Sequence, residues 1–216
     1  MKVCVSLLAL FLYISPAHAD DMADVHHLQE RWAEIKYRLP PEEQEKAFAG
    51  LIREAESLAA TNGDNAAILV WEGIIRSTYA GVKGGLGALS EVKKAKQEFE
   101  RAIEIDPAAM NGSAYTSLGS LYYQVPGWPL GFGDDKKARE MLEKGLEINP
   151  RGIDSNFFYG DYLKSMKEYK AALVVFEKAL QAPPRPGREL ADEGRKHEIE
   201  TAIQEIKTKL AKEQRG

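Results

Sequence analysis

Residues 159–184 of the chain read YGDYLKSMKEYKAALVVFEKALQAPP, and this stretch decides the fold. Small residues at Gly160, Ala172 and Ala179 are spaced among large apolar ones, and a proline pair ends the segment. The same order of small, large and proline residues recurs upstream between 118 and 150. A unit that repeats in this way cannot bury its own apolar face and must stack on a neighbour. The sequence therefore predicts an all-α solenoid with an extended binding surface.

The ends of three predicted helices repeat almost as phrases. They read RAIEIDP at 101–107, KGLEINP at 144–150 and KALQAPP at 178–184. Proline closes each helix because it lacks an N–H group and restricts the residue before it. The prolines at 150 and 184 are 34 residues apart, which is the period of tetratricopeptide repeats.

The chain resembles a tetratricopeptide repeat (TPR) protein. The resemblance rests on Leu118, Gly119, Tyr122, Ala138, Pro150, Gly160, Tyr169, Ala172, Phe176, Ala179 and Pro184. It covers residues 65–184 well and 28–60 only loosely. It implies helix-turn-helix units, stacked so that the first helix of each pair lines an inner groove.

Residues 1–19 form a predicted secretory signal peptide. Lys2 gives a positive start, an apolar run follows to Ile14, and Ala17 and Ala19 form a small-x-small cleavage site. A secreted protein of the periplasm is expected after cleavage. Residues 20–216 are then a single α-solenoid domain. Its helix pairs are expected at about 28–60, 65–107, 112–150 and 153–184, with a C-terminal capping helix at 188–212.

Composition excludes several classes of function. Cys4 is the only cysteine and leaves with the signal, so no disulfide, thiol nucleophile or cysteine metal site is expected. The chain has 29 Lys and Arg against 33 Asp and Glu, and loss of Lys2 leaves 28 and a net charge of −5. The charges are mixed without a basic block, so nucleic acid is not an expected partner. No cofactor, metal site or membrane span after cleavage is predicted, and a homo-oligomer is left open.

Two turns within repeats are longer than the 34-residue period allows, around 82–92 and around 124–135. They fall at the same point of consecutive repeats, so we expect them side by side on one edge. The second contains PGWPLGFGD at 126–134, a stiff loop with two prolines and three glycines. Trp128 and Phe132 either present flat apolar area to a partner or fold back to fill the crevice between repeats.

The TPR resemblance also implies which residues line the inner groove. They are Val70, Ile74, Ser77, Thr116, Ser120, Tyr123, Phe157, Asp161 and Lys164. The groove is mixed with an apolar tendency, and it lacks the Lys, Asn and Arg set with which some TPR domains clamp a peptide carboxylate. An apolar helix or extended segment of a protein is therefore the expected ligand.

The phrase YYQVPGWP at 122–129 is similar to the repeat-protein component associated with TRAP-type transporters. That resemblance implies a periplasmic scaffold or adaptor that binds a solute-binding protein. The alternative is a carrier of a small apolar ligand, held between the groove and the inserted loops. An adaptor needs an open groove and an exposed Trp128, whereas a carrier needs an enclosed cavity of roughly a few hundred Å³. No catalytic constellation is found, so the chain is not expected to be an enzyme.

Weaker motifs have structural explanations. GVKGGLG at 81–87 lacks the ending of a phosphate loop and follows a helix, so a flexible connector is expected. Asp134 and Asp154 each precede a predicted helix and are interpreted as N-caps. His26 and His27 lack partners at the spacing of a metal site.

Overall fold

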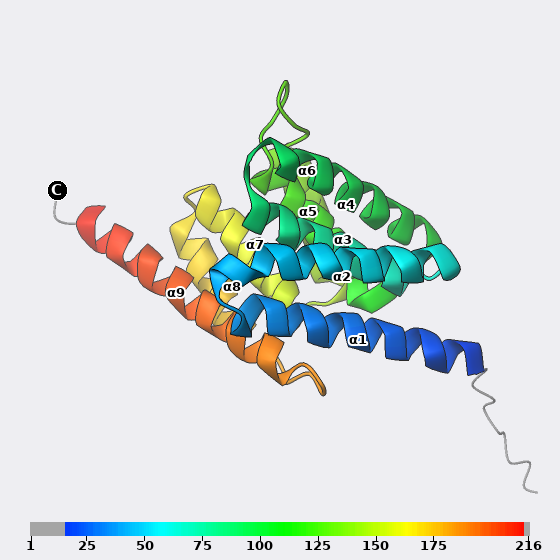
Figure 1. Ribbon diagram of the computed structural model, residues 1–216. Helices are drawn as coiled ribbons and strands as arrows, with labels where there is room; N and C mark the ends of the chain where they lie inside the picture. Colours follow the sequence, from blue (N-terminus) through cyan, green and yellow to red (C-terminus); the bar gives the residue numbers. More distant parts are fainter. Residues whose placement is uncertain (1–15, 214–216) are drawn as a thin grey trace, which may run out of the picture.

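The computed structural model describes residues 16–213, with side chains from residue 22 onward. Within this range the chain forms nine α-helices and no strand. They are α1 (Pro16–Arg38), α2 (Pro41–Thr61), α3 (Ala66–Lys83), α4 (Gly85–Ile105), α5 (Ala109–Gln124), α6 (Asp135–Ile148), α7 (Ile153–Ser165), α8 (Tyr169–Leu180) and α9 (Glu189–Glu213). Consecutive helices pack as pairs (Figure 1). The predicted all-α solenoid is confirmed.

The predicted signal peptide lies mostly outside the described residues. Only its last four residues, 16–19, fall within them, at the start of α1. None of the helices in the described part of the chain is long and apolar enough to cross a membrane.

The two helices of a pair approach closely where a glycine faces a large side chain. A Cβ added to Gly119 of α5 would lie 2.7 Å from Cγ of Leu142 on α6. A Cβ on Gly160 of α7 would lie 2.9 Å from the ring of Phe176 on α8. Both glycines belong to the pattern of small residues in the sequence, and the structure places them at helix crossings. A larger residue at either position would push the pair apart.

Gly73 occupies the same place in the pair α3 and α4, although the sequence pattern did not single it out. A Cβ there would lie 2.5 Å from the ring of Phe99, which is fully buried. The close crossing therefore recurs in three successive pairs.

The first of the two predicted insertions is not a loop. α3 continues to Lys83 and α4 starts at Gly85, so that the extra residues lengthen the two helices. Gly84 and Gly85 make the sharp junction with φ of 63° and 62°, a left-handed conformation that glycine adopts without a Cβ clash. Val92, beyond the junction, is buried. The second insertion is a true loop between Gln124 and Asp135.

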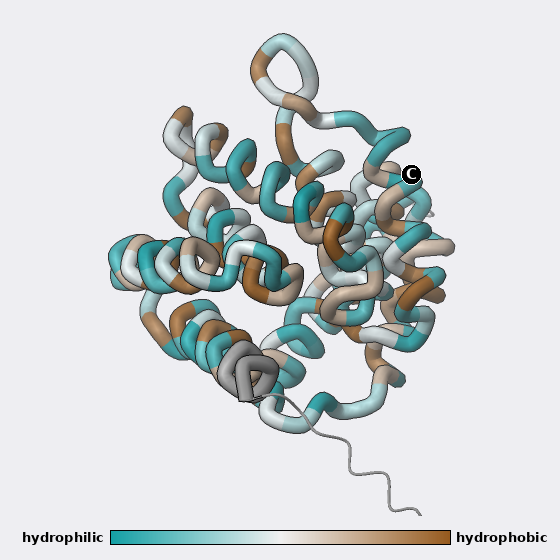
Figure 2. Tube along the Cα trace, turned by 90° about the vertical axis from the view of Figure 1, so that its right-hand side faces the viewer, coloured by the Kyte–Doolittle hydropathy of each residue, from teal (hydrophilic) through white to brown (hydrophobic). Residues whose placement is uncertain are grey.

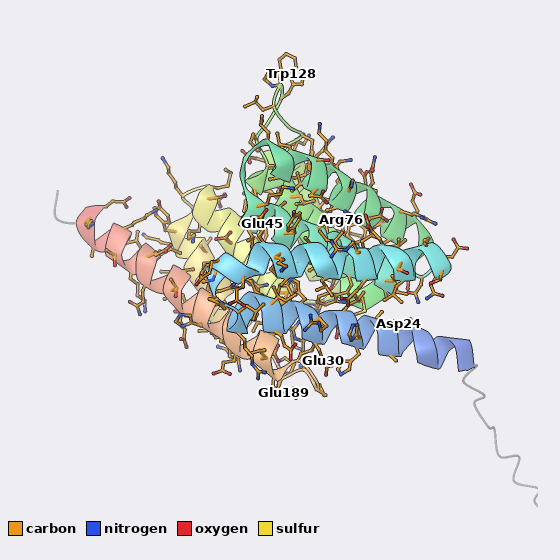
Figure 3. The ribbon with its side chains drawn as sticks, viewed as in Figure 1. Asp24, Glu30, Glu45, Arg76, Trp128 and Glu189 are labelled. Carbon is orange, nitrogen blue, oxygen red and sulfur yellow. The ribbon has the colours of Figure 1, made fainter. Side chains whose placement is uncertain are left out.

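Arg76 ties three helices together on the buried side of α3 (Figure 3). Its side chain is 5% exposed and lies 2.8 Å from carboxylate oxygens of both Glu72 and Glu91. It also pairs with Glu56 of α2. Burial opposes the charge, but the three carboxylates outweigh it and raise the pKa of Arg76 above its usual value.

The C-terminal helix does more than cap the last pair. Three isoleucines of α9 are buried in the core shared with α7 and α8: Ile199, Ile203 and Ile206. Its first half crosses to α1, where a Cβ on Gly194 would collide with the ring of Tyr37. Nζ of Lys36 lies 3.7 Å from Oε1 of Glu198 at the same crossing. The first and last helices therefore meet, and the solenoid closes on itself (Figure 1).

Candidate binding groove

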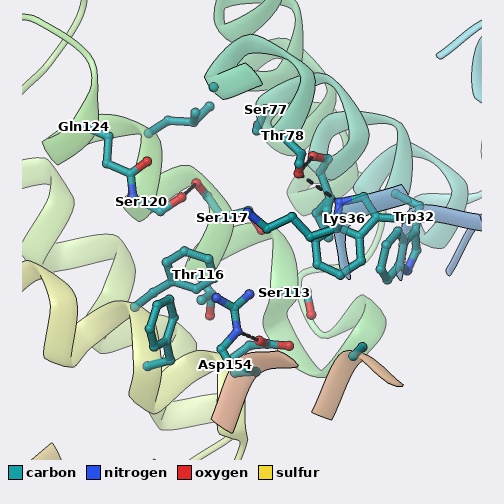
Figure 4. Close-up of a pocket in the computed structure, with 18 of the residues that line it drawn as sticks. Trp32, Lys36, Ser77, Thr78, Ser113, Thr116, Ser117, Ser120, Gln124 and Asp154 are labelled. Atoms are coloured by element: carbon teal, nitrogen blue, oxygen red, sulfur yellow. Dashed lines mark hydrogen bonds and ion pairs between the residues drawn. The ribbon is translucent and has the colours of Figure 1, made fainter. Parts of the chain in front are cut away.

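A cavity of about 1230 Å³ occupies the inner face of the solenoid. Its walls come from α1, α3, α5 and α7, which are the first helices of the four pairs, and also from α4, the inserted loop, the segment before α9 and the start of α9. Figure 4 shows Trp32 and Lys36 of α1 on one side, Ser117 and Ser120 of α5 across from them, and Asp154 of α7 below. We call this cavity the groove.

Hydroxyl groups form one wall of the groove. Ser113, Thr116, Ser117 and Ser120 of α5 and Ser77 and Thr78 of α3 all line it. Several donate their protons to their own helix: Ser77 Oγ to the carbonyl of Gly73 at 2.7 Å, and Ser120 Oγ to that of Ser117 at 2.8 Å. Because these protons are taken, the oxygens face a ligand chiefly as hydrogen-bond acceptors.

Aromatic rings of α1, α3 and α7 line another part of the groove. Trp32 and Trp71 lie edge to face with ring centroids 6.0 Å apart, and Phe157 and Phe158 lie 5.1 Å apart. Nε1 of Trp32 donates to Oγ1 of Thr78 at 2.9 Å, which fixes that ring. Such rings offer flat apolar area with little conformational freedom to lose.

An ion-pair network closes the α9 end of the groove. Asp154 of α7 accepts from Nη1 of Arg185 at 2.7 Å and from Nε of Arg195 at 2.8 Å. Arg185 also reaches Asp192 at 2.6 Å, and Arg195 reaches Glu198 at 2.6 Å. The network joins the segment before α9, α9 itself and the first turn of α7.

The charged groups in this network shift one another's pKa values. Burial alone would raise the pKa of Asp154, but Arg195 and Arg185 outweigh it and hold that pKa well below its usual range. Burial opposes the charge of Arg195, but Asp154 outweighs burial and raises the pKa of the guanidinium. Asp154 was interpreted as an N-cap, which is wrong. Gly152 takes that position, and Asp154 in the first turn is committed to the two arginines.

The inserted loop separates its two aromatic residues. The loop projects away from the helices (Figure 2), and Trp128 stands at its tip and is 89% exposed (Figure 3). Phe132 folds back instead, edge to face with Tyr122 at 5.8 Å between ring centroids. The two alternatives left open by the sequence are both realised, one in each residue. The expected N-cap at Asp134 is confirmed, because its side chain accepts from the N–H groups of Lys136 and Lys137.

Not every residue predicted for the groove reaches it. Six line it: Ile74, Ser77, Thr116, Ser120, Phe157 and Asp161. Val70 is fully buried in the core instead. Tyr123 and Lys164 lie just outside, where Tyr123 Oη donates to Asp161 at 2.8 Å and Lys164 Nζ lies 3.3 Å from the same carboxylate. The binding role of all these residues stays a prediction.

The sequence analysis missed the residues that α1 and α9 bring to the groove, chiefly Trp32, Tyr37, Arg188 and Arg195. Only the dense run PPRPGR at 183–188 signals that the chain turns sharply there. His26 and His27 each lie near one glutamate, Glu30 and Glu54, and the described residues hold no group of three metal-ligating side chains.

Comparisons with known proteins agree with this architecture. Residues 86–108 and 153–186 match the family model of the tetratricopeptide repeat. Among solved structures, the chain is similar to TTC0263, a thermophilic TPR protein of Thermus thermophilus, with 15% identity, 88% of this chain and 82% of that chain covered, and a TM-score of 0.59. It is also similar to MamA, with 17% identity, 81% and 96% coverage, and a TM-score of 0.45. A comparison with curated proteins found no match.

Fold and family match together define the class: an all-α, TPR-like solenoid, in which residues 86–108 and 153–186 match the repeat itself. Such a fold is typical of scaffolds for protein interaction.

Proposed function

We propose that this protein is a non-catalytic scaffold that holds a segment of a partner protein in the groove. The volume of the groove supports this best. At about 1230 Å³ it exceeds the roughly 300–1,000 Å³ of pockets that enclose drug-sized molecules. A short helix or an extended segment fills such a space, and TPR-like grooves present first helices to it along their length.

The chemistry of the walls supports a peptide-like ligand. The hydroxyl oxygens of α3 and α5 accept hydrogen bonds, and an extended backbone supplies N–H donors. The rings of Trp32 and Phe157 take apolar side chains elsewhere in the groove. A carrier of an apolar small molecule is the second candidate. The aromatic rings favour it, but the row of hydroxyls does not.

The proposal includes secretion to the periplasm and a partner there. Its support is the signal-like sequence of residues 1–19. The partner class suggested by the resemblance of residues 122–129 is the solute-binding protein of a TRAP-type transporter, with Trp128 as an exposed anchor beside the groove.

A groove-filling substitution tests this function. Ser117→Trp places a large ring in the groove, whereas Ser57→Trp adds the same ring to the exposed face of α2. We expect purified wild type and Ser57→Trp to capture one stoichiometric partner from a periplasmic extract, and Ser117→Trp to lose it while keeping its helical content. A partner that Ser117→Trp still captures contradicts groove binding. A copurified apolar compound without a protein partner supports the carrier.

A further inference from the structure

The tip of the inserted loop leaves apolar side chains in water. Residues 126–130 read PGWPL and are all exposed. Trp128 is 89% exposed, and Leu130 is 67% exposed. A run of exposed apolar residues is a defect in a protein surface unless it has a function. The tip therefore indicates a surface that another body covers.

The loop is a narrow projection whose two sides touch, and we call residues 125–134 the finger. A Cβ added to Gly131 would collide with the carbonyl oxygen of Pro126, and a Cβ on Gly133 would collide with that of Val125. Glycine permits this approach because it has no side chain. The finger points away from the helices with Trp128 at its tip (Figure 3). Its shape holds that ring away from the body of the protein.

The tip has few polar groups that would lose water on entering lipid. Residues 126–133 contain no ionisable side chain. Two of the eight are prolines without an N–H group, and three of the other six N–H groups donate to the carbonyls of Pro126 and Gly127. Unpaired backbone groups are a main cost of moving a loop out of water. A protein interface usually has a polar rim, which this tip lacks, so its chemistry favours lipid.

Lysines stand at the base of the finger. Nζ of Lys96 lies 5.9 Å from the ring centroid of Phe132, and Nζ of Lys137 lies 5.6 Å from that of Tyr122. Lysine beside an apolar tip is typical of segments at a lipid interface, because its charge stays among the headgroups. Two aspartates at 134–135 offset these charges, and the whole chain is acidic. Attraction to lipid therefore comes from the apolar tip rather than from net charge.

We propose that the finger docks the protein on the surface of a lipid bilayer, with Trp128 and Leu130 inserted at the interface. A tryptophan ring suits that depth because its body is apolar and its N–H group is polar. The inference goes beyond the proposed function, which depends on the groove. The resemblance of residues 122–129 suggests a protein as the contact of Trp128, whereas the chemistry of the tip points to lipid.

Vesicle flotation tests the docking. The probe is phosphatidylcholine vesicles at about millimolar lipid, since two inserted side chains bind more weakly than a myristoyl chain, whose association constant is about 10⁴ M⁻¹. We expect the wild type to float with the vesicles and Trp128→Ala to bind at least about tenfold more weakly. Leu130→Ser should also weaken binding. Val174→Ser is its matched control on α8, because Val174 is 66% exposed, and it should float like the wild type.

Tryptophan fluorescence reports the insertion itself. The chain has three tryptophans, and Trp32 and Trp71 are only 6% and 4% exposed, so lipid contact changes chiefly the emission of Trp128. We expect emission at shorter wavelength with vesicles and quenching by brominated lipid, both absent in Trp128→Ala. Added phosphatidylglycerol should not strengthen binding, because an acidic chain gains nothing from anionic lipid.

Several outcomes would overturn the docking. One is a wild type that does not float, and another is Trp128→Ala that floats equally well. A shift of emission that needs a higher protein concentration and no lipid would assign the ring to a second copy. Loss of partner capture by Trp128→Ala, without vesicle binding by the wild type, would assign the ring to a protein. Ser117→Trp should still float, so a failure of docking is distinguishable from a failure of groove binding.

Discussion

At the scale of single residues, two buried arginines carry much of the fold. Arg76 joins α2, α3 and α4, and Arg195 joins α7 to α9. Each is surrounded by carboxylates. Removal of Arg76 would leave the buried Glu72 without its partner, whereas the carboxylates beside Arg195, Asp154 and Glu198, are partly exposed. Helical repeats usually pack through apolar residues alone, and these ionic contacts make particular positions less replaceable than their neighbours.

Arg76→Ala should lower the free energy of unfolding by about 3–5 kcal/mol, because Glu72 is left buried without its partner. Urea denaturation followed by circular dichroism measures this loss. Lys144→Ala removes an exposed ion pair with Glu147 and should leave the midpoint unchanged. Equal effects of the two substitutions would refute the role given to Arg76.

Asp154 should make stability depend on acid. Its folded-state pKa lies well below its unfolded value, so the stabilisation is fully present above about pH 4 and is lost as pH falls below that. Chemical denaturation between pH 6 and pH 3, in wild type and Asp154→Asn, measures the effect. We expect a flatter pH dependence in the variant, and parallel curves would argue against the assignment.

The helix phase explains which groove residues could be predicted. Ser120 and Gln124 are four residues apart and both line the groove, whereas Tyr123, three residues on, falls to its side. An α-helix has 3.6 residues per turn, so a step of three residues falls short of a full turn and a step of four exceeds it. A repeated pattern of such steps therefore moves away from the groove-facing side towards the ends of a helix. Val70 lies near the start of α3, where that helix is buried in the core, so its side chain does not reach the groove.

At the scale of elements, the recurring crossing of glycine and large residue could be predicted because it repeats at fixed spacing in the sequence. The exact geometry at the start of α5 could not. Met110, Asn111 and Gly112 are all left-handed, with φ of 50°, 56° and 74°, and the regular helix begins only after them. Asn111 and Gly112 favour such a turn, but methionine has no preference for that conformation, so the sequence does not mark the turn at Met110.

Gly119→Ala should destabilise the pair of α5 and α6 by about 1–3 kcal/mol, because the added methyl meets Leu142. Gly50→Ala is the matched change, since the nearest atom to its new methyl is Nη2 of Arg53 at 3.8 Å. Alanine there should raise stability by about 0.5–1 kcal/mol through its better helix propensity. Thermal melting of both variants measures the opposite signs. A neutral Gly119→Ala would show that the crossing has room.

Substitutions in the inserted loop at 125–134 can distinguish a role in stability from a role in binding. Trp128→Ala should leave the melting temperature unchanged because the ring is exposed. Phe132→Ala should cost about 1–3 kcal/mol, since that ring packs on Tyr122. Melting curves check both statements. If Trp128→Ala still captures the partner as well as the wild type, the loop is not an anchor.

At the scale of the whole molecule, α9 decides the shape. The sequence predicted a terminal capping helix from its amphipathic stripe, and burial of Ile199 and Ile206 agrees with that. Its contact with α1 could not be predicted, because residues so far apart leave no periodic signal. The arginines that close the groove were missed for the same reason.

Gly194→Val should detach α9 from α1, because the larger side chain would overlap the ring of Tyr37. We expect a larger radius of gyration in solution scattering and a lower melting temperature. Ala211→Val, on the exposed end of the same helix, should change neither. An unchanged radius of gyration for Gly194→Val would mean that α1 and α9 adjust at their contact without separating.

The meeting of α1 and α9 also sets a time order for folding. During synthesis the chain emerges from its N-terminus, so the face of α1 around Tyr37 stays bare until residues 189–213 have been made. An ordinary solenoid can nucleate in any repeat and grow by nearest neighbours. Here the contact joins Tyr37 and Gly194, which are 157 positions apart in a chain of 216 residues, and contacts of high sequence separation form slowly. The meeting of α1 and α9 is therefore expected to be the final and slowest event, and a truncated nascent chain leaves this face of its first helix uncovered.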